Sequence, residues 1–208
     1  MISMISIMNN LCAQRPIFHS EADFQHSLAW EIHNGLPDSS VRLELPWSIE
    51  ENQNHLDIWI ASSDFKIAIE LKYKTRGLKA LVNREFYSLK DQSAQDIGRY
   101  DFLKDVMRLE QLIKKNNDWT GFAILLTNDS SYWKIPNNFN TIDANFRLHE
   151  GKTILGNLSW GAGAASGTIR DRESPINLNN SYHLNWNDYS RPSSGGYSRF
   201  RFLLLQVN

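Results

Sequence analysis

The stretch from His55 to Lys74, HLDIWIASSDFKIAIELKYK, constrains the fold more than any other part of the chain. Apolar and polar side chains alternate on both sides of a short polar segment, which is typical of two strands joined by a tight turn. If the turn is centred on Ser63 and Asp64, paired positions add up to 127, and Asp57 lies directly opposite Glu70. Facing side chains in such a pair have Cβ atoms about 4.5–5.5 Å apart. The hairpin therefore predicts two neighbouring carboxylates.

The second strand of this hairpin places a lysine beside the carboxylates. Because side chains alternate along a strand, Glu70 and Lys72 share one face, and Ile67, Ile69 and Leu71 form an apolar ridge on the other. Two close carboxylates repel each other unless a cation or a proton lies between them. We interpret the group as a site built on rigid backbone. A cross-strand salt-bridge cluster is the alternative.

The elements around the hairpin predict an α/β fold. Ser20 is a helix N-cap followed by acids in the first turn, and Gly35 and Pro37 end that helix. The expected order is helix, three strands, helix and strand, which favours a mixed central sheet flanked by helices. The expected ranges are 21–34, 41–47, 56–61, 66–73, 91–116 and 121–127.

The chain reads as one domain. Residues 1–19 are expected to be a leader, either poorly ordered or an early strand, and 20–208 a single domain with its core at 20–129. Residues 130–208 form a β-rich C-terminal extension with strands expected at 182–186 and 199–207. Because this extension is short and broken by loops such as 160–167, we expect it to add strands to the same domain.

Composition and charge restrict the cellular location and the binding partners that we expect. The apolar runs are strand-sized, far below the roughly 20 residues of a membrane helix, so no membrane association is expected. The single Cys12 excludes an internal disulfide and favours a reducing, cytoplasmic location. The net charge is −1, but residues 66–84 carry six basic residues and one acid. This run is either a phosphate-binding surface or a solvated basic face.

The chemistry suggested by these residues is phosphodiester hydrolysis. Asp57 and Glu70, with the backbone carbonyl of Leu71, supply hard oxygen ligands suited to Mg²⁺. Such an ion lowers the pKa of a bound water and polarises a phosphate. The ammonium of Lys72 is suited to orient the water or stabilise the developing charge. The pattern therefore predicts a Mg²⁺ cofactor, with Mn²⁺ as a substitute.

An acid in one hairpin strand, followed by acid-X-Lys in the next, resembles the PD-(D/E)XK nuclease superfamily, which has a restriction-endonuclease-like αβββαβ core. The matching residues are Asp57, Glu70, Leu71 (as X) and Lys72, and the resemblance covers about residues 20–129. One departure is Leu56, which stands where the motif has proline. The resemblance implies a metal-dependent nuclease.

Many members of that superfamily take a further acid from the first helix. Glu21 lies on the same helical stripe as Phe24 and Leu28, where an acid is costly unless it is paired. It is therefore the expected fourth site residue and metal ligand. Glu31 on the same stripe is the alternative, and Glu44 is expected to face solvent.

The resemblance also implies nucleic-acid contacts. RecB-like members carry Gln and Tyr four apart on the second helix, where this chain has Gln95, Asp96 and Tyr100. Tyr100 is therefore a candidate contact to nucleic acid, with packing against the sheet as the alternative. The basic residues after the site are expected to contact phosphates: Lys74, Arg76, Lys79 and Arg84.

Two classes of function remain at this point. The first is a nuclease acting on nucleic acid, with DNA expected and RNA left open, and with a homodimer compatible with double-strand cleavage. The second is a non-catalytic module that binds nucleic acid or protein, in which the acids form a salt-bridge cluster.

Overall fold

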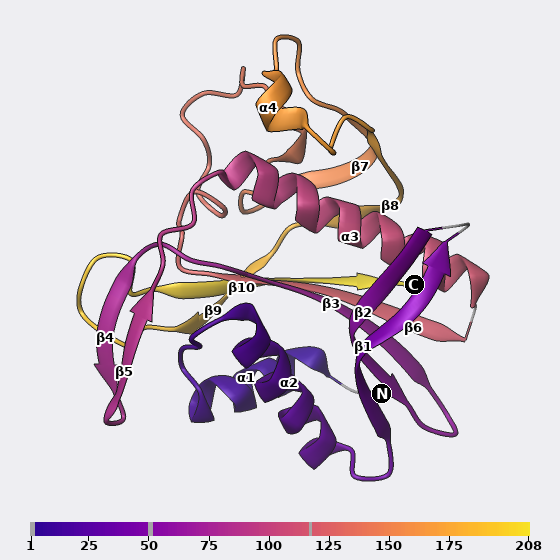
Figure 1. Cartoon of the computed structure of the whole chain (residues 1–208), viewed down its shortest axis with the longest axis vertical. Helices are drawn as coiled ribbons and strands as arrows, with labels where there is room; N and C mark the ends of the chain where they lie inside the picture. Colours follow the sequence, from indigo (N-terminus) through magenta and orange to yellow (C-terminus); the bar gives the residue numbers. More distant parts are fainter. Residues whose placement is uncertain (1–2, 50–51, 117) are drawn as a thin grey trace.

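A six-stranded mixed sheet crosses the centre of the protein in this computed structural model, which describes residues 3–49, 52–116 and 118–208 (Figure 1). The strand order is β1-β2-β3-β6-β10-β9. β3 and β6 are parallel, and the other neighbours are antiparallel. The strands are β1 (Ser40–Ile49), β2 (Asn52–Ala61), β3 (Lys66–Lys74), β6 (Trp119–Thr127), β9 (Trp186–Ser190) and β10 (Phe200–Val207). The expected α/β fold with a mixed central sheet is confirmed.

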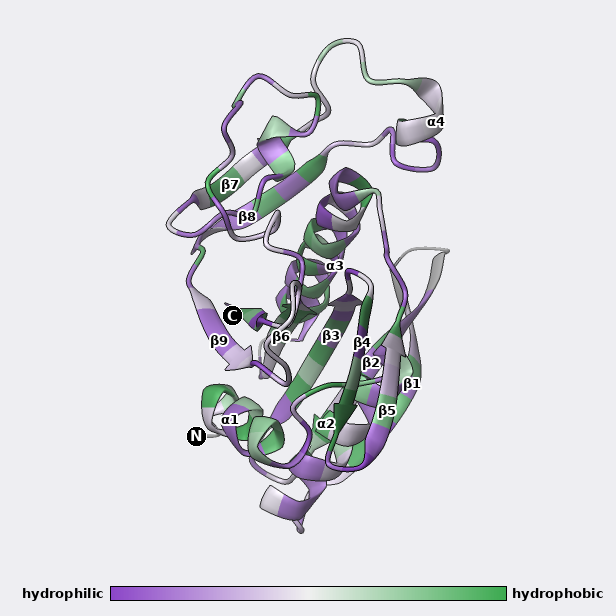
Figure 2. Cartoon of the chain, turned by 90° about the vertical axis from the view of Figure 1, so that its left-hand side faces the viewer, coloured by the Kyte–Doolittle hydropathy of each residue, from purple (hydrophilic) through white to green (hydrophobic). Residues whose placement is uncertain are grey.

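Helices cover both faces of the sheet. α1 (Met4–Gln14) and α2 (Glu21–Gly35) pack on one face, where the apolar side chains of β3 point. α3 (Gln95–Lys115) crosses the other face between β3 and β6. Figure 2 shows α3 between the sheet and a two-stranded layer of β7 (Thr153–Leu158) and β8 (Ile176–His183). The short helices are η1 (Ala144–Phe146) and α4 (Ser166–Ile169).

The β2–β3 hairpin has the predicted register. Its four pairs run from Ala61↔Lys66 to Ile58↔Ile69, so paired positions add up to 127. The N–H of Ser62 donates to the carbonyl of Phe65 at 2.9 Å, which closes the turn around positions 63 and 64. The ladder stops at Ile58↔Ile69, although β3 continues its pairing with β6 as far as Lys74↔Thr127. Beyond Ile69, the β2-facing edge of β3 is therefore open to other partners.

The N-terminal leader expected from the sequence is corrected in the structure. Residues 1–2 lie outside the described residues, but 4–14 form α1, whose Met4, Met8 and Leu11 are buried in the core. Cys12 Sγ contacts the carbonyl of Tyr189 at 2.5 Å on the C-terminal strand β9. The stretch in which apolar and small residues alternate forms a helix, because one face of that helix packs against α2 and β9.

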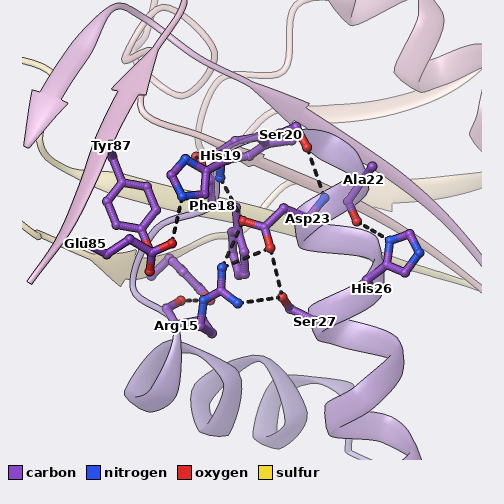
Figure 3. Close-up of polar contacts among 12 residues, drawn as sticks. Arg15, Phe18, His19, Ser20, Ala22, Asp23, His26, Ser27, Glu85 and Tyr87 are labelled. Atoms are coloured by element: carbon purple, nitrogen blue, oxygen red, sulfur yellow. Dashed lines mark hydrogen bonds and ion pairs between the residues drawn. The ribbon is translucent and has the colours of Figure 1, made fainter. Parts of the chain in front are cut away.

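A second hairpin, which the sequence reading did not identify, follows β3. It consists of β4 (Leu78–Val82) and β5 (Glu85–Leu89) and carries part of the basic run. Figure 3 shows how side chains join it to the segment between α1 and α2. The ring of His19 stacks on Tyr87 at 4.3 Å between centroids, and its Nε2 lies 2.8 Å from Glu85 Oε1. These contacts fix the hairpin against the helical layer.

Two strands of the C-terminal extension, β9 and β10, join the central sheet. β10 pairs with β6, and β9 pairs with β10. The expected strand at 182–186 is interrupted, because β8 ends at His183 and β9 begins at Trp186. No helix in the described ranges is both long and apolar enough to span a membrane.

Candidate functional site

The open edge of β3 is occupied by two carboxylates. The N–H of Leu71 donates to Asp57 Oδ2 at 2.5 Å, and the N–H of Tyr73 donates to Glu21 Oε2 at 2.6 Å. Asp57 and Glu21 thus take the backbone donors that β2 would have paired had the ladder continued. Because a residue in an antiparallel pair directs its N–H and C=O to the same side, the carbonyl of Leu71 faces this edge as well. We call this region, where β2 and β3 separate, the fork.

A glutamine and a third acid adjoin the fork. Gln25 lies one helical turn after Glu21 and is buried, and its Nε2 donates to Glu44 Oε1 at 2.6 Å and to the carbonyl of Asp57 at 2.8 Å. Glu44 has a left-handed φ of 51°, which is strained for a residue with a side chain. Its side chain is exposed, as expected, but it contacts Gln25 beside Asp57.

The sheet face beneath α3 holds the other two motif residues. Lys72 Nζ lies 2.6 Å from Asp105 Oδ2, and Glu70 Oε1 lies 3.8 Å from Arg108 Nη2. Arg108 also contacts Asp105, with Nη1 at 3.0 Å from Oδ1. Glu70 and Asp105 are buried. Helix α3 therefore contributes a carboxylate and a guanidinium to the group formed by Glu70 and Lys72.

The electrostatics of this group favour binding of a cation or a proton. Burial raises the pKa of Asp57 from 3.8 to about 6, against the hydrogen bond from Leu71 and the charge of Lys72, which lower it. Burial also raises the pKa of Glu70, and the charges of Asp105 and Asp57 raise it further. Burial lowers the pKa of Lys72, but the ion pair and hydrogen bond with Asp105, together with the charges of Glu21 and Asp57, raise it overall. Lys72 is therefore held as a cation beside carboxyl groups that resist ionisation.

The fit of a divalent cation rests on Asp57 and Glu70. Glu70 Oε1 is buried and accepts no hydrogen bond in the described part of the chain, and its nearest cation is Arg108 at 3.8 Å. Among the described residues, no three His, Cys, Asp or Glu side chains form a group that could hold a metal in this arrangement. Binding Mg²⁺ would therefore require the side chains of Asp57 and Glu70 to converge, and a buried carboxylate oxygen without a hydrogen bond is suited to that change.

The four basic residues expected to contact nucleic acid fall into two places. Lys74 is half-buried at the end of β3, and Arg76 follows it, with Nε 2.8 Å from Asp91 Oδ1. Lys79 and Arg84 are exposed on the β4–β5 hairpin. Lys74 and Arg76 therefore continue directly from the fork along β3, whereas the other two project away from the sheet.

Tyr100 is placed differently from its expected role. Its ring is buried against Phe146 and Trp160, and its hydroxyl donates to the carbonyl of Ser174 at 2.8 Å. The side chain therefore contributes to the core, and the expectation that it contacts nucleic acid is corrected. The cause is the extension, which covers this part of α3 with residues outside the resemblance.

The structure also places the other residues that the sequence singled out: Gln95, Asp96 and Glu31. Gln95 donates to Asp129 Oδ2 at 2.8 Å just beyond β6, and Asp96 accepts from the N–H of Ile97 in the first turn of α3. Glu31 accepts from Gln14 Nε2 at 2.8 Å, on the side facing α1. Of the two helix acids considered, Glu21 is the one that the structure brings to the fork.

Three residues at the site were missed from the sequence: Gln25, Asp105 and Arg108. One signal was available for Asp105, because it lies within the apolar stripe of α3, next to Val106 and four residues before Leu109. The reasoning applied to Glu21, that an acid on an apolar face needs a partner, holds equally for Asp105. Its partner Lys72 could not be inferred without knowing how α3 crosses the sheet.

Comparison with known proteins gives no relative: no protein-family model matches the chain, and no curated protein or solved structure matches it. Any functional assignment therefore depends on the geometry and chemistry of the fork.

Proposed function

We propose that the protein is a Mg²⁺-dependent nuclease that hydrolyses phosphodiester bonds at the fork between β2 and β3. The observation that carries the proposal is that Asp57, where the β2–β3 ladder stops, lies near enough to Glu70 and Lys72 for their charges to shift one another's pKa values. Buried carboxyl groups with raised pKa values beside a permanently charged lysine suit a reaction in which negative charge develops on a phosphate.

Each residue has a role in this proposal. Asp57 and Glu70, with the carbonyl of Leu71, would hold Mg²⁺, and Glu21 adds a carboxylate at the next position along β3. The ion, when bound, supplies an acidified water and polarises the phosphate. Lys72 orients that water or stabilises the transition-state charge; its raised pKa argues against its acting as the base.

The proposed family is the PD-(D/E)XK superfamily, with the restriction-endonuclease-like core as the finer fold assignment. Its support is the order of α2, β1, β2, β3, α3 and β6, with the motif residues at the fork. DNA is the proposed substrate, with Lys74 and Arg76 as phosphate contacts next to the site. A cytoplasmic location and a homodimer acting on both strands complete the proposal.

One observation favours the alternative of a non-catalytic binding module. Lys72, Asp105, Arg108 and Glu70 already form a connected ion-pair network beneath α3. In that case the fork would stabilise the fold, and removing its charges would change stability without affecting any cleavage.

A cleavage assay distinguishes the proposed nuclease from a non-catalytic binding module. The full chain is incubated with Mg²⁺, Mn²⁺ or a chelator on linear, circular, single-stranded and branched DNA and on RNA. We expect metal-dependent cleavage that is lost in Asp57→Asn and Glu70→Gln but kept in Asp64→Asn, a change at the exposed hairpin turn. Cleavage that survives in Asp57→Asn would contradict the site, and a folded chain that cleaves none of these substrates would favour the binding module.

A further inference from the structure

Two adjoining surface hollows lie where the parallel strands β3 and β6 end. One has a volume of about 350 Å³ and the other about 500 Å³, and both are lined by Ser130, Lys134 and Tyr197. They are formed by the segment after β6 and by the β9–β10 connection, which Figure 1 shows at the same end of the sheet as the β4–β5 hairpin. The C-terminal extension therefore builds most of this surface. We call the two together the extension hollow.

The extension hollow is strongly basic in a chain whose net charge is −1. The one acid in its lining, Asp129, has its carboxylate occupied by hydrogen bonds from Gln95 Nε2 and from the N–H of Ser131. Lys134 and Arg191 have no acidic partner among the residues that the structure describes. The lining also holds three arginines that are each ion-paired with an acid outside it: Arg76 with Asp91, Arg147 with Asp143 and Arg199 with Asp188.

An aromatic ring lies at the centre of these charges. Tyr197 is 49% exposed and adopts a left-handed φ of 57°. The guanidinium carbon of Arg76 lies 5.0 Å from its ring centroid. Asn128 Nδ2 donates to the carbonyl of Tyr197 at 2.7 Å, and Asn128 Oδ1 accepts from the N–H of Arg76 at 2.7 Å. The exposed ring is therefore held by contacts on its backbone and its arginine neighbour.

Arg76, in the lining of the hollow, links it along the chain to the fork. Lys72, Lys74 and Arg76 stand at alternate positions along and just beyond β3, and four residues of extended chain span at most about 14 Å. The lining of the hollow therefore begins within about 14 Å of Lys72 along the chain. Cations that follow a backbone, combined with an exposed aromatic ring, are the features of single-stranded nucleic-acid binding.

We propose that the extension hollow binds an unpaired segment of nucleic acid, with Lys134 and Arg191 contacting phosphates and Tyr197 stacking on a base. The inference rests on the proposed nuclease function, because the fork would act on the strand that the hollow holds. It also assigns a role to the C-terminal extension, which lies outside the resemblance. Stacking does not depend on base identity, so binding would tolerate any sequence.

The test is direct binding without catalysis. A fluorescent single-stranded 12-mer of deoxythymidine and a blunt duplex of equal length are titrated with the full chain in a chelating buffer, over a series of salt concentrations. We expect tighter binding of the single strand. Tyr197→Leu should weaken it on the order of tenfold. Lys134→Ala and Arg191→Ala should each lower the slope of log affinity against log salt by about 0.7. Lys115→Ala, an exposed change at the end of α3, is the matched control.

The outcomes separate this inference from the proposed function. Selective loss of single-strand affinity in the hollow variants, with Lys115→Ala binding normally, would support the hollow even if the wild type cleaves nothing. Cleavage by the wild type with equal single-strand affinity in all variants would overturn the hollow and leave the nuclease intact. Equal losses for single strand and duplex would overturn the assignment to unpaired nucleic acid. Thermal unfolding of each variant checks that it folds.

Discussion

The ammonium of Lys72 lies 2.6 Å from Oδ2 of Asp105, and both side chains are largely buried between β3 and α3. Asp105 is also among the causes of the raised pKa values of Asp57 and Glu70. One residue of the crossing helix thus orients the lysine and makes the two motif carboxyl groups harder to ionise. Asp105 is therefore a positioning residue whose removal should alter the pH dependence of the site.

Asp105→Asn should shift the acid limb of the pH–rate profile of cleavage to lower pH. With the charge of Asp105 removed, Asp57 and Glu70 ionise more readily, so metal-binding carboxylates are present at lower pH. The rate at the optimum should fall on the order of a hundredfold, because Lys72 loses its anchor. Asp101→Asn, on the same helix but paired with Arg172, is the control and should leave the limb unchanged. An unchanged limb in Asp105→Asn would rule out the positioning role.

Asp57→Asn should stabilise the fold at neutral and alkaline pH. The folded protein keeps the Asp57 proton up to about pH 6, whereas the unfolded chain loses it near pH 4. The folded state therefore binds more protons across this window, and the stability of the wild type falls as pH rises through it. Above pH 6 the cost approaches about 3 kcal/mol at most, since one pKa unit corresponds to about 1.4 kcal/mol, and partial exposure reduces it.

The measurement is urea unfolding of the wild type and Asp57→Asn at pH 4 and pH 8. The asparagine retains an oxygen that can accept the Leu71 N–H, so the change isolates the charge. We expect equal stabilities at pH 4 and a more stable variant at pH 8, with Asp64→Asn matching the wild type throughout. A variant that is less stable at pH 8 would contradict the raised pKa of Asp57.

Mg²⁺ should stabilise the folded chain in a pH-dependent way. An ion that binds only the folded state adds about 1.4 kcal/mol at ten times its Kd, enough to raise the Tm by several degrees. Because the ligands must be ionised, the increase should be larger at pH 8 than at pH 5.5. A thermal scan with and without chelator measures it. Glu70→Gln should show no increase, and an equal increase in that variant would place the ion elsewhere.

Glu110 on α3 binds β8, so its removal tests how much the layer that covers α3 contributes to stability. Its buried carboxylate accepts hydrogen bonds from the N–H and Nδ2 of Asn179, the N–H of Asn180 and the hydroxyl of Tyr182. Glu110→Ala leaves these donors without a partner and should cost about 3 kcal/mol of unfolding free energy. Exposed Glu173→Ala should change it by less than about 0.5 kcal/mol. Similar losses in both variants in urea unfolding would show that the β8 contact is not a source of stability.

The parts of the fold that could be predicted are those fixed by local pattern. The register of β2 and β3 follows from alternation and one short turn, so the pairs from Ala61↔Lys66 to Ile58↔Ile69 could be derived from the sequence. The next pair, Asp57 opposite Glu70, is not part of the ladder, because Asp57 accepts the Leu71 N–H instead. Helix α2 was equally accessible, because Ser20 caps it and its carboxyl end is marked by Gly35 and Pro37. The resemblance and the apolar stripe together pointed to Glu21 or Glu31, and only the structure distinguishes Glu21, which reaches β3, from Glu31, which contacts α1.

The parts that could not be predicted depend on contacts between distant segments. Asp105 meets Lys72 only because α3 crosses the sheet at one particular position, and Tyr100 is buried only because the extension covers it. Helix α1 was not predicted, because its short alternating sequence is stabilised as a helix by packing against α2 and β9. The extension hollow joins residues near 76, 130 and 197, and no local pattern links them.

The most direct test of the proposed nuclease compares Lys72→Ala with Lys66→Ala, two lysines on the same strand and the same face of β3. The rate of Mg²⁺-dependent cleavage is measured for both on the substrate that the wild type cleaves best, after circular dichroism has confirmed that each variant is folded. If the fork is the active centre, Lys72→Ala loses at least about a hundredfold in rate. Lys66→Ala, which loses its contacts with Asp118 and the ring of Trp119 at the other end of the strand, retains the wild-type rate. Equal rates in the two variants would contradict the assignment of catalysis to the fork.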